Sequence, residues 1–315
     1  MDEKSIREIC LAHQLQCNNI TKLIGSFDKE LFFIDDKYLI RTSKQSMLEE
    51  QNRINRVKDL KHVPKILYAS DQSNTDDNIY YLILQCVPGC ELLANYHNLQ
   101  ERDIREIGME IADFLHDLHN LRGNKYDIGH YIPIVPDYDK SWRSGHEVYW
   151  NDIYNKLKNI QLSEEAEHML ELSNKYINAN ISCLDYENGP SLLHNDFYYK
   201  NIIIHNHAFS GVIDWECSQY GEADFDLIHL LHWCIFPPSK DLDLTQLFTT
   251  IFCSYMRESS IPMLDKRLSI YLLEHDFMQI LWSQGKRADE LLTRIKWWLE
   301  NLEKYIQKLF IIEEG

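Results

Sequence analysis

The sequence lacks an apolar run of the ~18 residues that a membrane-spanning helix needs. Its first ten residues, MDEKSIREIC, are charged and contain no apolar core of the kind that signal peptides have. Both absences argue against a membrane or secreted protein. We therefore expect a cytoplasmic protein that has no membrane partner.

The eight cysteines include no CxxC pair, and no internal repeat or low-complexity tract is present. Zinc sites and disulfide frameworks depend on clustered or regularly spaced cysteines. We therefore expect reduced thiols, most of them buried.

Positive charge is scarce, since 32 Lys and Arg residues stand against 49 Asp and Glu residues, for a net charge of −17. Nucleic acids bind basic surfaces, so a nucleic-acid partner is disfavoured. An acidic protein attracts cationic small molecules through its summed field, although acidity also serves solubility alone. Charge thus supports a cationic substrate without identifying one.

The 315 residues, 44% of them hydrophobic, are sufficient for two domains or for two lobes with sizeable cores. Short β-branched and aromatic runs bounded by turn residues predict five strands, at residues 20–24, 30–34, 38–41, 65–69 and 79–85. Apolar residues at helical spacing predict helices at 2–17, 46–60, 100–120, 142–160 and 164–178, and over most of 242–310.

The most informative stretch is 192–227, LLHNDFYYKNIIIHNHAFSGVIDWECSQYGEADFDL. Apolar runs at 202–204 and 212–213 flank a polar turn and predict a hairpin. Asn201 precedes the first strand and Asp214 follows the second, so pairing would bring both to one edge. An amide oxygen and a carboxylate suit Mg²⁺.

Asp196 lies in the loop that leads to this edge, five residues before Asn201. From there it could accept the proton of a substrate hydroxyl as that oxygen attacks a phosphoryl group. His194 is better placed to brace the loop than to act as a base. Isolated Asp and Asn residues at hairpin ends are common for turn chemistry alone, but their order and spacing here favour a site.

The order His194-x-Asp196-x4-Asn201, then Ile213-Asp214-Trp215-Glu216, then Gly221-x4-Asp226-Leu227 resembles the aminoglycoside phosphotransferase and choline kinase superfamily. These small-molecule kinases share a histidine-any-aspartate loop and a metal-binding aspartate with protein kinases. The resemblance implies a bilobal α+β fold of the protein-kinase type. It implies a small nucleotide-binding lobe at 1–87 with five antiparallel strands, and a larger, mainly helical catalytic and substrate-binding lobe at 88–315.

The resemblance also implies a nucleotide site for ATP or GTP with Mg²⁺. Arg41 would hold the phosphates, and Glu50, which shares a helix face with Ile54 and Val57, would orient it. The alternative is an edge-strand arginine and a surface acid.

The remaining nucleotide contacts would come from two loops. Ser26 lies in the turn that covers the phosphates in family members, a turn that here has the single glycine Gly25. The purine would bond backbone groups of Gln85 and Val87, beside Leu84. Asp226 would brace the catalytic loop by accepting its amide hydrogens.

Aminoglycosides are the leading substrate class, because the resemblance and the acidity agree. Macrolides, choline or another metabolic alcohol stay open. Four acids are candidate contacts for a cationic substrate, namely Asp137, Glu216, Glu274 and Asp276. We expect a monomer. The alternative from another class is a kinase-like binding module without catalysis.

Overall fold

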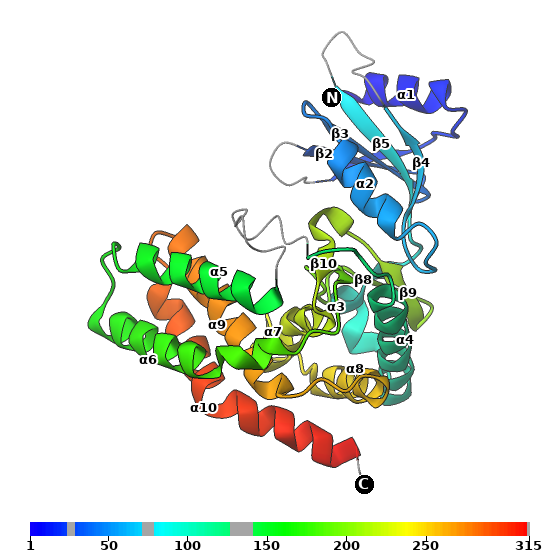
Figure 1. Ribbon diagram of the computed structural model, residues 1–315. Helices are drawn as coiled ribbons and strands as arrows, with labels where there is room; N and C mark the ends of the chain where they lie inside the picture. Colours follow the sequence, from blue (N-terminus) through cyan, green and yellow to red (C-terminus); the bar gives the residue numbers. More distant parts are fainter. Residues whose placement is uncertain (24–28, 71–78, 127–140, 314–315) are drawn as a thin grey trace. The chain divides into compact units, whose positions relative to one another are not determined.

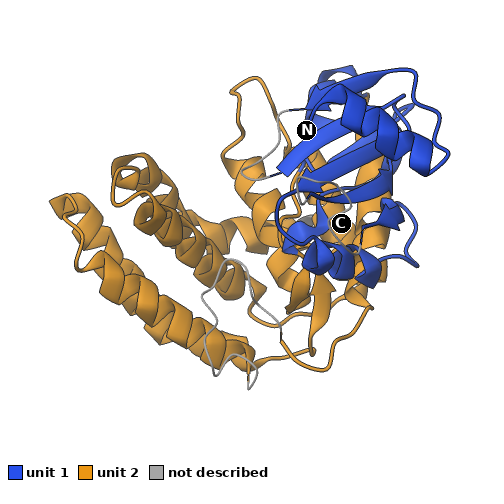
Figure 2. Cartoon of the chain, turned by 90° about the horizontal axis from the view of Figure 1, so that it is seen from above, with its two compact units in different colours: residues 1–99, 199–217 blue, residues 100–198, 218–315 orange. Residues whose placement is uncertain are grey.

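The computed structural model describes residues 1–23, 29–70, 79–126 and 141–313 (Figure 1). The chain forms two compact units, coloured in Figure 2. Unit 1 comprises residues 1–99 and 199–217, and unit 2 comprises residues 100–198 and 218–315. These units reflect packing, so the functional lobe boundary near residue 88 stays a prediction.

Unit 1 contains the five-stranded antiparallel sheet that the sequence predicts, in the order β1-β2-β3-β5-β4. Its strands are β1 (Ile20–Leu23), β2 (Lys29–Ile34), β3 (Tyr38–Ser43), β4 (Lys65–Ala69) and β5 (Tyr80–Gln85).

Alternating side chains give the sheet two different faces. Phe32, Ile40 and Ile83 are buried on one face, in a cluster with residues of α1 (Glu3–Ala12). Arg41 projects from the opposite face and contacts Glu50 of α2 (Leu48–Arg56). One face is therefore an apolar core, and the other carries charge.

Unit 1 also contains a smaller sheet of order β6-β8-β9. Its strands are β6 (Cys90–Glu91), β8 (Ile202–His205) and β9 (Ala208–Val212), and the short helices α3 (Leu92–Asn95) and η1 (Tyr96–Asn98) follow β6. Gly89 has φ +120°, and a Cβ there would lie 2.1 Å from the carbonyl oxygen of Ile204. Glycine is required here because β6 approaches β8 so closely.

Unit 2 is mainly helical. Ile107, Ile111 and Leu115 form the predicted apolar stripe of α4 (Glu101–His119) and are fully buried. The other helices are α5 (Trp142–Leu157), α6 (Glu164–Asn180), η2 (Ile181–Asp185), η4 (Ala223–Asp226), α7 (Leu227–Ile235), α8 (Thr245–Glu258), α9 (Leu264–Trp282) and α10 (Ala288–Glu313).

A two-stranded antiparallel ladder joins β7 (Ser191–Leu193) to β10 (Gln219–Gly221) within unit 2. It anchors both ends of the segment that contains the predicted catalytic loop.

Among the described residues, no helix is both long enough and apolar enough to cross a membrane. The α+β class and the five-stranded antiparallel sheet are thus confirmed.

Candidate functional site

Asn201 and Asp214 lie at the same end of the β8–β9 hairpin in unit 1. Ile202 pairs with Val212, and the amide of Ile213 donates to the carbonyl oxygen of Asn201 at 2.9 Å. The ladder therefore holds the two residues at one edge, because strand register fixes which residues face each other.

Asp214 has a left-handed backbone with φ 67°, which turns the chain sharply away from β9. Its Oδ1 is buried and has no hydrogen-bond partner among the described residues, and Nη2 of Arg41 lies 3.8 Å from it. A buried, orphaned carboxylate oxygen fits a hard cation such as Mg²⁺, which prefers oxygen ligands.

Arg41 and Glu50 form an ion pair in which Nη1 lies 2.7 Å from Oε1, and both side chains are over 90% buried. Nη2 of Arg41 also donates to Glu216 at 3.3 Å. Glu216 belongs to η3 (Trp215–Cys217), and its carbonyl oxygen accepts from Arg53 of α2. Glu216, a candidate substrate acid by sequence, is thus engaged with cations of its own unit.

Lys29 is a further member of this cluster that the sequence interpretation missed. Its Nζ lies 2.9 Å from Oε2 of Glu50 and also contacts the carboxylate of Glu216. Burial lowers the pKa of Lys29, but the charge of Glu50 and the hydrogen bond to Glu216 outweigh it, so this pKa lies above its usual value. The ammonium is therefore charged.

A cavity of about 490 Å³ adjoins this cluster within unit 1. Arg41 and Asp214 line one part of it, while Leu84, Gln85 and Val87 from the end of β5 line another. The predicted nucleotide contacts that the structure describes, apart from Glu50, thus share one cavity. Ser26 lies outside the described residues.

The predicted catalytic loop follows β7 in unit 2. Asp226 is fully buried and accepts the backbone amides of His194 at 2.8 Å and Asn195 at 2.7 Å. Nδ1 of His194, also fully buried, accepts the amide of Asp196 at 3.3 Å. Asn195 has φ 64°, a conformation that Asn tolerates better than most residues. These bonds hold the loop while Asp196 stays partly exposed.

His119 of α4 supports the same loop through Asp226, a role that the sequence did not indicate. Its Nε2 lies 3.1 Å from Oδ2 of Asp226, and its Nδ1 lies 2.7 Å from the hydroxyl of Tyr255. The signal in the sequence was only a histidine at a helix C-terminus, which the helix dipole explains equally well. Asp226 therefore has a buried imidazole partner besides the two amides.

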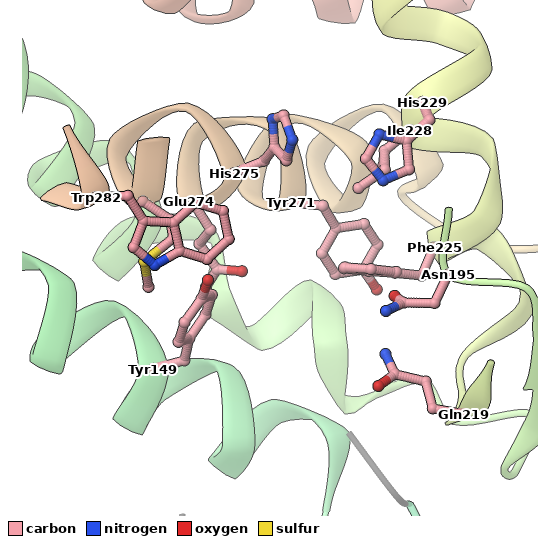
Figure 3. A pocket seen from close by; sticks show the side chains of 11 residues that line it. Tyr149, Asn195, Gln219, Phe225, Ile228, His229, Tyr271, Glu274, His275 and Trp282 are labelled. Carbon is pink, nitrogen blue, oxygen red and sulfur yellow. The ribbon is translucent and has the colours of Figure 1, made fainter. Parts of the chain in front are cut away.

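A second cavity, of about 40 Å³, lies in unit 2, and Figure 3 shows Tyr271 and Glu274 of α9 beside it, with Tyr149 of α5. Glu274 is buried, and its Oε2 lies 2.6 Å from Nδ1 of His146. Its Oε1 has no hydrogen-bond partner among the described residues. Burial raises the pKa of Glu274, although the charge of His146 and its hydrogen bond oppose this.

Asp276 differs from Glu274, because residues two apart on a helix face different sides. It is fully buried, contacts the guanidinium of Arg294, and accepts from Nε1 of Trp298 at 2.7 Å. Burial raises the pKa of Asp276, but the hydrogen bond from His275 and the charge of Arg294 outweigh it, leaving this pKa below its usual range.

Asp276, His232 and His275 are also close enough together to hold a metal ion. Arg294 already bonds two of them, since its Nη2 lies 3.1 Å from Nδ1 of His232 and contacts Asp276. A guanidinium thus fills the place that a metal would need.

The last acid predicted to contact the substrate, Asp137, lies outside the described residues.

Comparisons with known proteins agree with this architecture. A search of curated proteins returned no match. The crystal structure of ADP-bound aminoglycoside phosphotransferase APH(2'')-Ib is 19% identical, with a TM-score of 0.66 over 95% of this chain and 97% of that one. Aminoglycoside phosphotransferase APH(4)-Ia is 14% identical, with a TM-score of 0.67 over 96% and 99%.

The GDP complex of aminoglycoside 2'-phosphotransferase-IIIa is similar to the same degree, at 12% identity and a TM-score of 0.67 over 97% of this chain and 99% of that one. At such identities these structures show the kinase-like fold. A sequence model of the phosphotransferase enzyme family matches residues 29–247, more than half of the chain. The chain therefore belongs to the phosphotransferase enzyme family.

Proposed function

We propose that this phosphotransferase moves the γ-phosphoryl group of ATP or GTP to a hydroxyl of a small molecule, with aminoglycosides as the leading substrate class. The observation that carries the proposal is the cavity of unit 1, where Arg41 and Asp214 meet the end of β5. The cavity offers a cation for phosphate, a carboxylate for a metal and an apolar strand end for a base.

In this proposal the purine lies beside Leu84 and bonds backbone groups of Gln85 and Val87. Arg41 binds the phosphates, and Glu50 fixes the direction of its guanidinium through the 2.7 Å ion pair. Backbone recognition of the base leaves the choice between ATP and GTP to experiment. The similar structures include ADP and GDP complexes, which supports a nucleotide in this family fold.

Asn201 and Asp214 would hold Mg²⁺, which when bound neutralises charge on the phosphate oxygens. Asp196 accepts the proton of the substrate hydroxyl as that oxygen attacks the γ-phosphorus. Its carboxylate is positioned because His194 and Asp226 hold the loop backbone. Catalysis is then mainly positioning and charge stabilisation, as phosphoryl transfer requires.

Glu274 is our preferred contact for an amino group of the substrate, because it has a buried oxygen without a partner beside the cavity of unit 2. Similar solved structures include a complex of APH(2")-IIa with gentamicin and one of APH(4)-Ia with hygromycin B. The aromatic residues around the cavity also make macrolides and choline worth testing.

The test is phosphorylation of an aminoglycoside, macrolide and choline panel with ATP or GTP, with Mg²⁺ or with EDTA, read by mass spectrometry of the acceptor. We expect Mg²⁺-dependent transfer to at least one aminoglycoside. Transfer only to another acceptor would correct the substrate class. A protein that binds no nucleotide and modifies no acceptor would refute the enzyme proposal and favour a binding module.

We further propose that the protein acts as a monomer in the cytoplasm, with no nucleic-acid partner. Light scattering of the purified protein tests the first point, and fractionation of producing cells tests the second. A stable dimer, or recovery with the membrane fraction, would contradict the proposal.

A further inference from the structure

The carboxylate of Glu216 lies between two cations of the sheet, Lys29 and Arg41. Lys29 and Arg41 are on adjacent strands, β2 and β3. Lys29 pairs with Ser43 in the ladder, and Ser43 lies two residues from Arg41, so both cations project from the same face. The register of the sheet thus builds a two-cation site.

Two acids each contact both of these cations. Glu50 contacts both, at 2.9 Å from Lys29 and 2.7 Å from Arg41, and it is 6% exposed. Glu216 contacts both as well but is 31% exposed. If the carboxylate of Glu216 moved away, the two cations would keep Glu50 and, 3.8 Å from Nη2 of Arg41, Asp214. Because the proposed function assigns Asp214 to Mg²⁺, one positive charge would then remain next to the cavity that Arg41 lines.

We propose that Lys29 and Arg41 together form the binding site for the nucleotide's phosphates, and that Glu216 occupies this site in the nucleotide-free protein. Glu216 is an internal anion that the polyphosphate displaces. This inference rests on the proposed function, since it assigns the phosphate contacts of the same nucleotide site.

The contacts of Glu216 permit such a displacement. Its backbone is held, because Arg53 donates to its carbonyl oxygen and Trp215 beside it is buried. Its side chain and that of Lys29, at 27%, are partly exposed, whereas Arg41 and Glu50 are over 90% buried. The carboxylate can therefore rotate to solvent while the backbone and the buried pair stay in place.

The experiment compares binding of ATP and of inorganic tripolyphosphate, by titration calorimetry, to the wild type and to four variants. Glu216→Gln keeps the size of the side chain and removes its charge, so we expect binding to become about fivefold tighter. Lys29→Met removes one phosphate cation, so we expect about tenfold weaker binding.

Glu49→Gln is the matched control. Glu49 is also on α2 and pairs with Arg53, and its side chain is 72% exposed. The substitution removes one negative charge near the site without touching Lys29 or Arg41, so we expect less than a twofold change. Glu216→Asp supplies a second test with a shortened carboxylate, for which we expect an intermediate gain in affinity.

Failure of the inference and failure of the proposed function are distinguishable. If ATP binds but Glu216→Gln leaves affinity unchanged or weakens it, Glu216 is not a displaced anion. If Glu216→Gln bound ATP more weakly than the wild type only when Mg²⁺ is present, Glu216 would be a metal ligand and the inference would be overturned. If tripolyphosphate binding follows the predicted order while ATP does not bind, the proposed function fails and the two-cation site stands.

Discussion

Buried charges in the two units of this protein are organised in different ways. In unit 2, Arg267 is fully buried, bonds both oxygens of Asp224 at 2.6 and 3.0 Å, and donates to two backbone carbonyls at 2.9 and 3.0 Å. In unit 1, Lys29 and Arg41 share the same two acids, Glu50 and Glu216, and Arg41 lines a cavity of about 490 Å³.

The difference separates a structural ion pair from a site that can exchange partners. Each of the three guanidinium nitrogens of Arg267 donates to a protein oxygen, and removing one partner of such a pair would leave an uncompensated buried charge. The cations of unit 1 share one buried acid, Glu50, and one partly exposed acid, Glu216, and in our proposal a ligand replaces Glu216. Burial of charge alone therefore does not indicate function, whereas access to a replaceable partner does.

The largest effect should come from Asp196→Ala, which separates the chemistry of unit 2 from the nucleotide site of unit 1. We expect phosphoryl transfer to fall about a thousandfold, as for loss of a general base. ATP affinity should stay within twofold of the wild type, because the proposed nucleotide contacts are in unit 1. Steady-state kinetics and calorimetry on the same samples measure both quantities.

Asp117→Ala is the control for this experiment, since Asp117 is an exposed acid of α4 in the same unit. It should leave transfer unchanged. An active Asp196→Ala enzyme would show that the base is another residue. Loss of ATP affinity in that variant would show that the two functions do not divide between the units as proposed.

A second prediction concerns the buried ion pair of unit 2, Arg267 and Asp224. Arg267→Ala should lower the free energy of unfolding by about 3–5 kcal/mol, because the carboxylate of Asp224 would be left buried without its cation. Arg143→Ala removes an arginine that pairs with two acids, Glu147 and Asp185, on the surface. There we expect a loss below about 1 kcal/mol.

Urea unfolding followed by circular dichroism compares these two variants with the wild type. Equal losses of unfolding free energy in the two variants would contradict the view that burial makes the Arg267–Asp224 pair important for stability. A loss of ATP affinity in Arg267→Ala at temperatures where it stays folded would give this pair a functional role that we do not assign.

A third prediction uses two cysteines as reporters. Cys86 lines the cavity of unit 1, and burial raises its pKa to about 11. Cys183 of unit 2 is 1% exposed, and burial raises its pKa to about 12. Alkylation of Cys86 by N-ethylmaleimide should slow about tenfold at an ATP concentration ten times the Kd, because bound nucleotide covers the cavity.

Cys183 should react slowly with or without ATP, and mass spectrometry of peptides reports both sites in one sample. The rate at Cys86 should rise with pH, because the thiolate is the reactive form. Equal rates at Cys86 with and without saturating ATP would place the nucleotide elsewhere.

The sequence was sufficient for the features that depend on local pattern. Short β-branched and aromatic runs between turn residues predicted the five strands and the hairpin, and register then brought Asn201 and Asp214 to one edge. Lys29 was missed because it was interpreted as part of the turn before a strand beginning at Glu30, whereas β2 begins at Lys29 itself. Because β2 begins one residue earlier than predicted, Lys29 is part of the sheet and lies on the same face as Arg41.

The partners of the two acids on α9 could not be predicted from the sequence. Glu274 and Asp276 looked alike as helix acids next to aromatic residues, but His146 is 128 residues from Glu274 and Arg294 is 18 residues from Asp276. The packing of the helices in unit 2 determines that Asp276 pairs with Arg294 while Glu274 lines a cavity. Helical periodicity does not contain that information.

The smallest effect concerns Glu274, a buried acid of unit 2 that is paired with His146 rather than with a lysine or an arginine. Because burial raises its pKa above the ordinary value of 4.5, the folded protein binds this proton more tightly than the unfolded chain. Its contribution to stability is therefore full below pH 4.5 and declines as the pH rises through the pKa of the folded state. Glu274→Gln stays neutral, so its free energy of unfolding should rise relative to the wild type across that window. Urea unfolding from about pH 4 to pH 8 measures the difference. A difference that stays flat or falls would contradict the prediction, because it would mean that His146 keeps this carboxylate charged in the folded protein.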